Sequence, residues 1–293
     1  MAGKAAVEAL LRDRKLDRTL TSTLPDRLGE DAVAPLDVPV LDSKIAGRDG
    51  PQGNAVGGGL PRGQVSEVVG PASSGRTSVA WAALAAATRR GESVALIDTF
   101  DRFDPPTAHA CGMDLSKLLW VRGQAVSKTS GAIDPAWLPG VRAVTGPGTF
   151  IERVIDRAIK SLNLVVQSGV CTLVVIDLID LPATALRRLP ASTWFRVERA
   201  IEGSDTAVLI LASMSVARSA GGRSIVLGEL PTRNALPDKH SSPDQRSSPG
   251  VVWKGDHDRS RRIGGMRGRA SINAARWAYA EQVNLEINVV NAV

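Results

Sequence analysis

The sequence predicts an α/β fold with a mostly parallel central sheet and helices on both faces. Short apolar runs of strand length alternate with longer stretches of helical periodicity, which is the order of strands connected by helices. Between the first clear strand and the first long helix lies the run Gly70-Pro71-Ala72-Ser73-Ser74-Gly75-Arg76-Thr77-Ser78. Its spacing is that of a phosphate-binding P-loop, a motif that works only between a strand and a helix.

The 293 residues divide into five segments by composition and pattern. A helix is predicted within residues 1–24, and residues 25–56 form a connector rich in proline, glycine and aspartate. The α/β core spans residues 57–230. Residues 231–250 hold four prolines and few apolar side chains, which indicates a flexible linker. A small basic C-terminal segment follows over residues 251–293.

Each element of the core has its own signal in the sequence. Residues 64–69 alternate apolar with polar side chains, as a short strand does. The alanine-rich residues 78–90 predict a helix that is apolar nearly all round and therefore packed on both sides. Further strands are expected at 93–97, 118–121, 172–176 and 207–211, a loop or lid at 124–150, and helices at 150–166 and within 182–201.

The candidate nucleotide-binding residues are those of the P-loop, namely Gly70, Ser73, Ser74, Gly75, Arg76, Thr77 and Ser78. The two glycines permit unusual backbone angles, and the N-terminus of the following helix offers free N–H groups to an anion. Arg76 stands where the motif has lysine, and its planar fork is wider than an ammonium group. Nucleotide binding is therefore expected to be weakened rather than excluded. The alternative is that the glycines only form a tight turn.

Two of the predicted strands end in aspartate, Asp98 after 93–97 and Asp177 after 172–176. Four apolar residues followed by an aspartate at the end of a strand form the Walker B pattern, whose carboxylate acts on Mg²⁺. The P-loop hydroxyl is the other usual protein ligand of this ion. We therefore expect Thr77 and Asp177 to hold Mg²⁺ if nucleotide binds, with Asp180 as the lesser candidate.

Several short motifs share their order and spacing with one known family. They are Gly57-Gly58-Gly59-Leu60-Pro61-Arg62-Gly63, Glu67-Val68-Val69-Gly70-Pro71, Arg90-Gly91-Glu92, Asp104-Pro105 and Gly112-Met113-Asp114-Leu115. Together with the P-loop, they resemble the RecA recombinase family from Gly57 to about Gly123. The resemblance implies a RecA-like P-loop core that takes ATP and Mg²⁺. Between Cys171 and Ala212 it is thinner, and beyond about residue 220 it ends.

The chain departs from RecA at three positions that carry chemistry there. The catalytic glutamate of RecA corresponds to Phe100, and its γ-phosphate-sensing glutamine corresponds to Ser213. With Arg76 in place of lysine, charge stabilisation, water positioning and γ-phosphate sensing are all altered. We therefore predict that no residue is catalytic, and that ATP with Mg²⁺ is a weak or vestigial ligand.

The chain looks like a member of the RecA-related ImuA subgroup. Three features carry this resemblance: the short length, Gly75-Arg76-Thr77 and the run Leu118-Leu119-Trp120-Val121-Arg122. ImuA proteins are accessory members of bacterial mutagenesis cassettes. The resemblance implies a non-catalytic role in SOS mutagenesis and translesion synthesis. The implied partners are an ImuB-like relative of Y-family polymerases, RecA or an error-prone polymerase. In RecA an N-terminal helix packs against the neighbouring protomer, which suggests an oligomer or partner contact for residues 1–24.

Two other functions stay open at this point. The first is a DNA-dependent ATPase of RecA-paralogue type in recombinational repair. In that case Arg76 would substitute for lysine, and Asp101 is the only nearby carboxylate that could replace the missing glutamate. The second is a DNA-binding modulator that acts through the C-terminal arginines alone.

Those arginines are the candidate nucleic-acid or partner contacts: Arg259, Arg261, Arg262, Arg267 and Arg269. Aromatic residues lie between and after them, and this combination can hold a phosphate backbone and stack on bases, single-stranded DNA included. A protein partner is an equal alternative. A third is a solvated β-hairpin around Gly264-Gly265 with Trp277 in the core. Residues 285–290 alternate apolar with polar side chains and predict a final strand at a sheet edge.

Composition restricts the class of protein. Hydrophobic residues make up 43% of the chain, yet no run of about 18 apolar residues occurs, so no membrane span is expected. Cys111 and Cys171 lack disulfide or metal-ligand spacing, which predicts buried thiols and a cytoplasmic location. The resemblance to RecA and ImuA implies association with the nucleoid. The net charge of +6 suits nucleic acid or an acidic partner but identifies neither.

Overall fold

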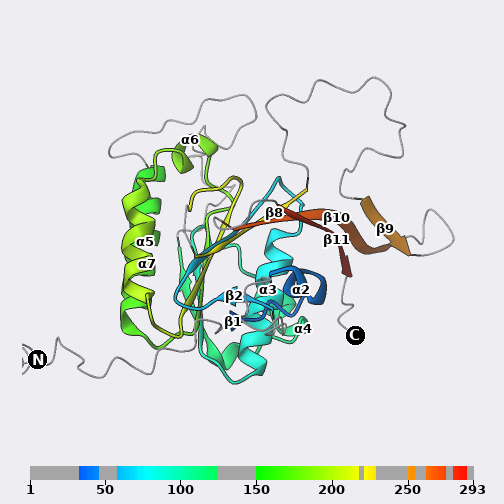
Figure 1. Cartoon of the computed structure of the whole chain (residues 1–293), viewed down its shortest axis with the longest axis horizontal. Helices are drawn as coiled ribbons and strands as arrows, with labels where there is room; N and C mark the ends of the chain where they lie inside the picture. The colour runs from blue at the N-terminus through cyan, green and yellow to red at the C-terminus, as the bar shows by residue number, and fades with distance from the viewer. Residues whose placement is uncertain are drawn as a thin grey trace, which may run out of the picture.

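The computed structural model describes residues 33–45, 58–123, 150–217, 221–228, 250–254, 262–274 and 280–288. Over these parts the chain forms a central sheet with a layer of helices on each face (Figure 1). Helices α5 and α7 pack on one face, and α2, α3 and α4 pack on the other. The predicted α/β class with a mostly parallel sheet is confirmed.

The main sheet of the described chain has nine strands. They are β3 (Val65–Val69), β4 (Val94–Asp98), β5 (Leu118–Arg122), β6 (Leu173–Asp177), β7 (Ala207–Ala212), β8 (Arg223–Leu227), β9 (Gly250–Lys254), β10 (Arg262–Ala274) and β11 (Glu281–Asn288). Their order is β11-β10-β8-β3-β7-β6-β4-β5, with β9 paired to β10. Two short strands, β1 (Val33–Ala34) and β2 (Leu60–Pro61), pair separately.

The strands from β8 to β5 are parallel, and the core of this half explains why. Every residue of β3, β4 and β7 is buried. Parallel strands that are covered on both faces read as continuous apolar runs. The apolar stretches at 93–97, 172–176 and 207–211 are therefore the interior of this half, and their carboxyl ends meet at one edge of the sheet.

The helices are α2 (Pro39–Ile45), α3 (Arg76–Arg89), α4 (Pro105–Ala110), α5 (Phe150–Ser168), α6 (Ala183–Leu186) and α7 (Ala191–Ile201), with a 3₁₀ turn η2 (Leu115–Lys117). In α5 the buried residues Ile151, Val154, Ala158 and Leu162 recur at the predicted spacing of three and four. Most of α3 is buried, as its apolar sequence predicts. The helical stretch within 182–201 is two helices, because Pro190 caps the start of α7 in an extended conformation.

The C-terminal strands extend the same sheet in antiparallel fashion. β10 pairs with β11 on one side, and with β8 and β9 on the other. β11 ends the sheet order, where a final edge strand was expected, and α2 packs against it. Gly264 and Gly265 lie inside β10, next to a shift in its register with β9, so a hairpin centred on them is wrong. Glycine tolerates the irregular backbone of such a bulge.

Arg62 connects the chain segments that precede the parallel strands β3, β4 and β7. Its Nε donates to the carbonyl oxygen of Val33 at 3.1 Å, and its Nη1 donates to that of Asp205 at 2.8 Å. Its Nη2 also forms an ion pair with Glu92 at 3.1 Å. This side chain, only 10% exposed, therefore joins segments that are far apart in the sequence.

Several predicted features lie outside the described residues. They are the helix at 1–24, most of the connector at 25–56, the loop before Phe150, the linker before Gly250, and Arg259, Arg261 and Trp277. Among the residues that the structure does describe, no helix combines the length and apolar character needed to cross a bilayer.

Candidate functional site

The P-loop lies where the motif requires it, between the end of β3 and the start of α3. Gly70 approaches the chain closely, because a Cβ there would lie 2.4 Å from the carbonyl oxygen of Leu227. Gly75 has φ 94° and forms the N-cap of α3 without a side-chain hydrogen bond. Both glycines are thus required by the backbone, and the first N–H groups of the helix have no capping side chain.

One polar atom in this loop indicates room for a ligand. The hydroxyl of Ser74 is buried and has no hydrogen-bond partner in the structure. A Cβ on Gly70 would lie 2.8 Å from it, so this hydroxyl points across the loop. Buried polar groups are nearly always paired, and an unpaired one beside an uncapped helix N-terminus fits an anion. The backbone of the loop is therefore compatible with bound phosphate.

The side chain of Arg76 does not extend freely from the loop. It is 5% exposed, and its Nη1 donates to the carbonyl oxygen of Ala212, the last residue of β7, at 2.8 Å. Burial lowers the pKa of Arg76 from its ordinary value, while the nearby charges of Asp177 and Asp180 act in the opposite direction. Arginine stays protonated under such conditions, so a buried cation lies over the carboxyl ends of the strands.

Asp98 and Asp177 are register partners at the ends of β4 and β6. Asp98 accepts hydrogen bonds from the backbone N–H groups of Arg102 and Phe103, both at 2.8 Å, and from Nε1 of Trp120 at 3.1 Å. These three donors use its oxygens within the protein. Asp98 therefore holds the loop after β4 in place.

The pKa of Asp177 is raised from 3.8 to about 7, and burial is the largest cause. The backbone N–H of Ile179 and the charge of Arg76 act to lower it, and the carboxylates of Asp98 and Asp180 act to raise it. The hydrogen bond from Ile179 measures 2.9 Å. A carboxyl group with this pKa is only partly ionised near neutral pH, which makes it a weaker Mg²⁺ ligand than an ordinary aspartate.

A cavity of about 260 Å³ brings two of the predicted site residues together. It is lined by Thr77, Ala80, Trp81, Leu96, Asp98, Arg102, Phe103, Asp177, Ile179, Asp180 and Leu211. Thr77 and Asp177, the predicted Mg²⁺ ligands, thus share this cavity with Asp180. Nε of Arg102 forms an ion pair with Asp180 at 3.1 Å, and both side chains are partly exposed. Across the described residues, no group of three or more His, Cys, Asp and Glu could hold a metal ion.

Phe100 and Asp101, the two residues considered for positioning a water, do not line this cavity. Phe100 is 3% exposed and belongs to the core beneath α5 and α7. Asp101 has φ 57° and accepts two hydrogen bonds from Arg122, at 2.8 and 2.7 Å. These bonds lower the pKa of Asp101, and the guanidinium of Arg122 also lies 4.5 Å from the ring centre of Trp120. The only carboxylate proposed to replace the catalytic glutamate is therefore held by another residue.

Glu67 is a buried acid of β3 whose role the sequence did not reveal. It is 2% exposed, and it accepts hydrogen bonds from the N–H groups of Val216 at 2.9 Å and Ala217 at 3.0 Å. The hydroxyls of Ser215 and Ser224 also donate to it. An acid inside an apolar strand was the available signal. Glu67 fixes the segment that follows β7, while Arg76 fixes the end of that strand.

Two of the predicted C-terminal contact residues can be placed relative to the P-loop cavity. Arg267 and Arg269 are exposed on β10, which is separated from β3 by β8, and neither lines that cavity. Of Arg262 only the backbone in β10 is described, and Arg259 and Arg261 fall outside the described residues. The role of all five as nucleic-acid or partner contacts stays a prediction.

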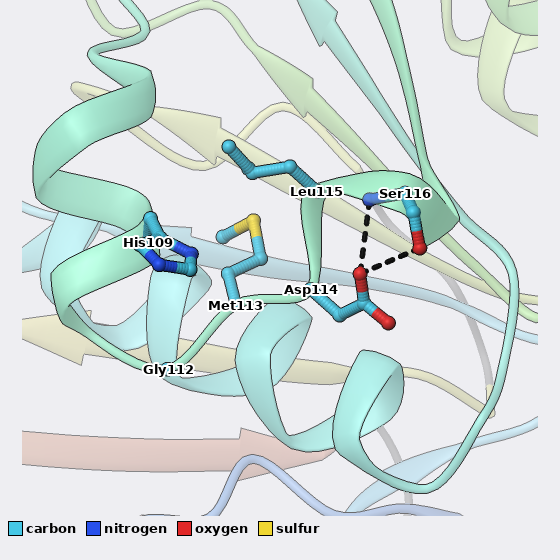
Figure 2. Close-up of a pocket in the computed structure, with 6 residues that line it drawn as sticks. All are labelled: His109, Gly112, Met113, Asp114, Leu115 and Ser116. Atoms are coloured by element: carbon cyan, nitrogen blue, oxygen red, sulfur yellow. Dashed lines mark hydrogen bonds between the residues drawn. The ribbon is translucent and has the colours of Figure 1, made fainter.

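A second cavity, of about 410 Å³, lies beside α4 and η2 (Figure 2). It is lined by His109, Gly112, Met113, Asp114, Leu115 and Ser116. Oδ1 of Asp114 accepts hydrogen bonds from the N–H of Ser116 at 3.0 Å and from its hydroxyl at 2.6 Å (Figure 2). The acid of this cavity thus caps η2, and we assign the nucleotide-related chemistry to the P-loop side.

Comparison with known proteins gives one family match. Residues 24–131 match the RecA N-terminal domain, a range that contains the P-loop, α3, β4 and β5. The P-loop part of the candidate site therefore lies in the matched range, whereas Asp177, Asp180 and Ala212 lie beyond it.

Similar proteins carry related names. A protein named RecA from Chlorobaculum tepidum is 42% identical over 147 residues, which is 47% of this chain and 41% of that protein. Protein RecA from Lactobacillus acidophilus is 34% identical over 186 residues, or 55% of this chain and 48% of the relative. DNA repair protein recA homolog 1, chloroplastic, from Arabidopsis thaliana is 32% identical over 144 residues, or 42% and 33%. The chain thus spans less than half of the length of each of these relatives.

Proposed function

We propose that this RecA-like chain is a non-catalytic accessory protein of the DNA-damage response. The observation that carries the proposal is the position of Phe100. A side chain that cannot bind water stands where RecA has its catalytic glutamate, and it is buried in the core. Asp101, the neighbouring acid, is held by Arg122. Phosphoryl transfer to water needs a group that orients the nucleophile, and neither Phe100 nor Asp101 is placed to supply it.

The names of the relatives support a role in DNA repair or recombination, since they are RecA proteins and a DNA repair protein. Within that field, the likeness to ImuA favours SOS mutagenesis and translesion synthesis. On this proposal the chain acts by contact with an ImuB-like relative of Y-family polymerases, with RecA or with an error-prone polymerase. The nucleotide site is then vestigial or a binding switch.

The outer face of α5 and α7 offers a surface for a protein partner. Leu164 on α5 is 70% exposed and Phe195 on α7 is 57% exposed, although other large apolar side chains of these helices, such as Leu162 and Trp194, are buried. Arg196 and Arg199 lie beside Phe195 on the exposed side of α7. Aromatic residues flanked by arginine are typical of the energetically important centres of protein interfaces.

ATP turnover by the purified chain tests the absence of catalysis. We expect no hydrolysis above the protein-free rate with Mg²⁺, with or without single-stranded DNA. The same is expected of Arg76→Lys, because restoring the lysine leaves Phe100 in place. DNA-stimulated hydrolysis by the native chain would contradict the proposal.

Co-purification with an ImuB-like protein tests the partner. The native chain should retain it, and Leu164→Asp with Phe195→Asp should lose it. Glu152→Lys, on the exposed face of the same layer, is the matched control. Equal retention by all variants would remove this surface from the proposal.

The competing function is a DNA-dependent ATPase of RecA-paralogue type. One observation favours it, namely that Thr77 and Asp177 line the same cavity, as Mg²⁺ binding would need. A RecA-like turnover rate abolished by Asp177→Asn would establish this alternative.

A further inference from the structure

We propose that the P-loop of this chain is a site for a nucleoside diphosphate without a metal ion, and that it discriminates against Mg²⁺-bound nucleoside triphosphate. The inference rests on the non-catalytic role proposed above and specifies the ligand of that site. It follows from the placement of the Arg76 side chain relative to the three groups that a P-loop normally offers to its ligand.

The backbone of the loop keeps what a diphosphate needs. In P-loops the N–H groups of the loop and of the helix N-terminus hold the α- and β-phosphates. Here Gly75 caps α3 without a side-chain hydrogen bond, so no capping side chain competes for the first N–H groups of the helix. Within the loop, the N–H of Ser74 donates to the carbonyl oxygen of Pro71 at 3.3 Å. The buried hydroxyl of Ser74 is an additional unpaired group within the loop. None of these contacts requires the side chain of residue 76.

The place of a third phosphate is altered. The P-loop lysine normally reaches the γ-phosphate, which lies between the loop and the ends of the adjacent strands. The side chain of Arg76 is instead buried and donates to the carbonyl oxygen of Ala212, at the end of β7, at 2.8 Å. To reach a third phosphate the guanidinium would have to leave that buried carbonyl without its donor, which costs free energy. A diphosphate avoids this penalty.

The place of the metal ion is altered for the same reason. The two carboxylates available near the loop, Asp177 and Asp180, both face the charge of Arg76. Asp180 also pairs with Arg102 at 3.1 Å. A divalent cation would compete with one guanidinium at each of these acids and would be repelled by both. The protein thus supplies the positive charge that Mg²⁺ would otherwise bring.

Competition titrations on the full chain, stripped of nucleotide, test this inference. Fluorescent MANT-ADP is bound first and then displaced by unlabelled ADP in EDTA, or by a non-hydrolysable ATP analogue with Mg²⁺. We expect ADP to bind at least tenfold more tightly than the triphosphate, and Mg²⁺ to leave ADP binding unchanged. Arg76→Lys should reverse the preference, because the shorter side chain releases Ala212. Arg89→Lys, an exposed position on the same helix, is the matched control and should keep the native preference.

Hydrogen exchange supplies a readout independent of the variants. ADP should protect the amides of residues 70–78 in the native chain and leave those after Ala212 unchanged, because the Arg76 bond persists. Equal or tighter binding of the Mg²⁺-triphosphate would overturn the inference, as would no binding of ADP up to about 1 mM. Both results differ from ATP hydrolysis or loss of the partner, which would contradict the proposed function instead.

Discussion

The guanidinium of Arg76 and the carbonyl oxygen of Ala212 are joined by a hydrogen bond of 2.8 Å. This bond connects the first residue of α3 to the last residue of β7, across 136 positions of sequence. At this position a P-loop usually carries a side chain that serves the ligand. Here the side chain forms a hydrogen bond within the fold. Its removal should therefore lower the free energy of unfolding even in the absence of nucleotide.

Arg76→Ala should destabilise the chain by about 2 kcal/mol, because it leaves a buried carbonyl unpaired and removes the cation that faces Asp177 and Asp180. Urea unfolding followed by circular dichroism measures the change. Arg89→Ala removes an arginine whose side chain is 46% exposed and should stay within about 1 kcal/mol of the native chain. An equal effect of the two substitutions would contradict a structural role for Arg76.

Glu67→Ala should destabilise the chain by about 3 kcal/mol. The substitution removes the carboxylate oxygen that accepts from the N–H groups of both Val216 and Ala217 and leaves these donors without it. Exchange of these two amides should accelerate along with the loss of stability. Glu202→Ala, at the exposed end of α7, is the control and should change neither quantity. Unchanged exchange at Val216 and Ala217 would show that another group holds the segment.

Asp177 should make stability depend on pH between about 4 and 7. Its pKa is raised from 3.8 to about 7, mainly by burial, so the folded state binds a proton that the unfolded state releases in this window. The stability contributed by this group is fully present below pH 3.8 and is lost as pH rises through 7.

The substitution Asp177→Asn removes this dependence. The stability of the variant relative to the native chain should rise from pH 4 to pH 7, by at most about 1.4 kcal/mol per pH unit. Denaturant midpoints at several pH values measure the difference. A constant difference across the window would show that Asp177 titrates as an ordinary aspartate.

Gly70→Ala should destabilise the chain by about 2 kcal/mol, because the new Cβ would lie 2.4 Å from the backbone oxygen of Leu227. Thermal unfolding measures the loss. Gly268→Ala in β10 is the matched control, since a Cβ there meets nothing within 4 Å, and its effect should stay below about 1 kcal/mol. A larger effect at Gly268 than at Gly70 would contradict close packing of the loop against β8.

The strands and the long helices could be predicted because their patterns reflect burial. The apolar runs ending at Asp98 and Asp177 are buried strands, and the spacing of three and four in α5 follows its buried face. The antiparallel half could not be placed in the same way. β8 was not recognised, because its apolar run from Ile225 to Leu227 is only three residues long and follows the polar Arg223 and Ser224.

The residues of the candidate site could be predicted from the sequence, but the contacts between them could not. The sequence identified Arg76, Thr77 and Asp177, and two of these share a cavity. Nothing in the sequence indicated that Arg76 would reach Ala212, because that contact depends on the order of strands in the sheet. The partners of Glu67 lie about 150 residues away, so local patterns could not reveal them either.

The central position of β3 determines when a newly made chain can complete its sheet. β3 emerges early from the ribosome, yet its two neighbours, β7 and β8, are translated more than 130 residues later. Arg62, just before β3, likewise cannot form its hydrogen bond to the carbonyl oxygen of Asp205 until that residue has been synthesised. Until Ala212 has been synthesised both edges of β3 stay open, and the edge that pairs with β8 stays open until Leu227 has been made. Unpaired strand edges promote aggregation. Nascent chains that stop before this residue are therefore the form of this protein that most needs chaperone protection.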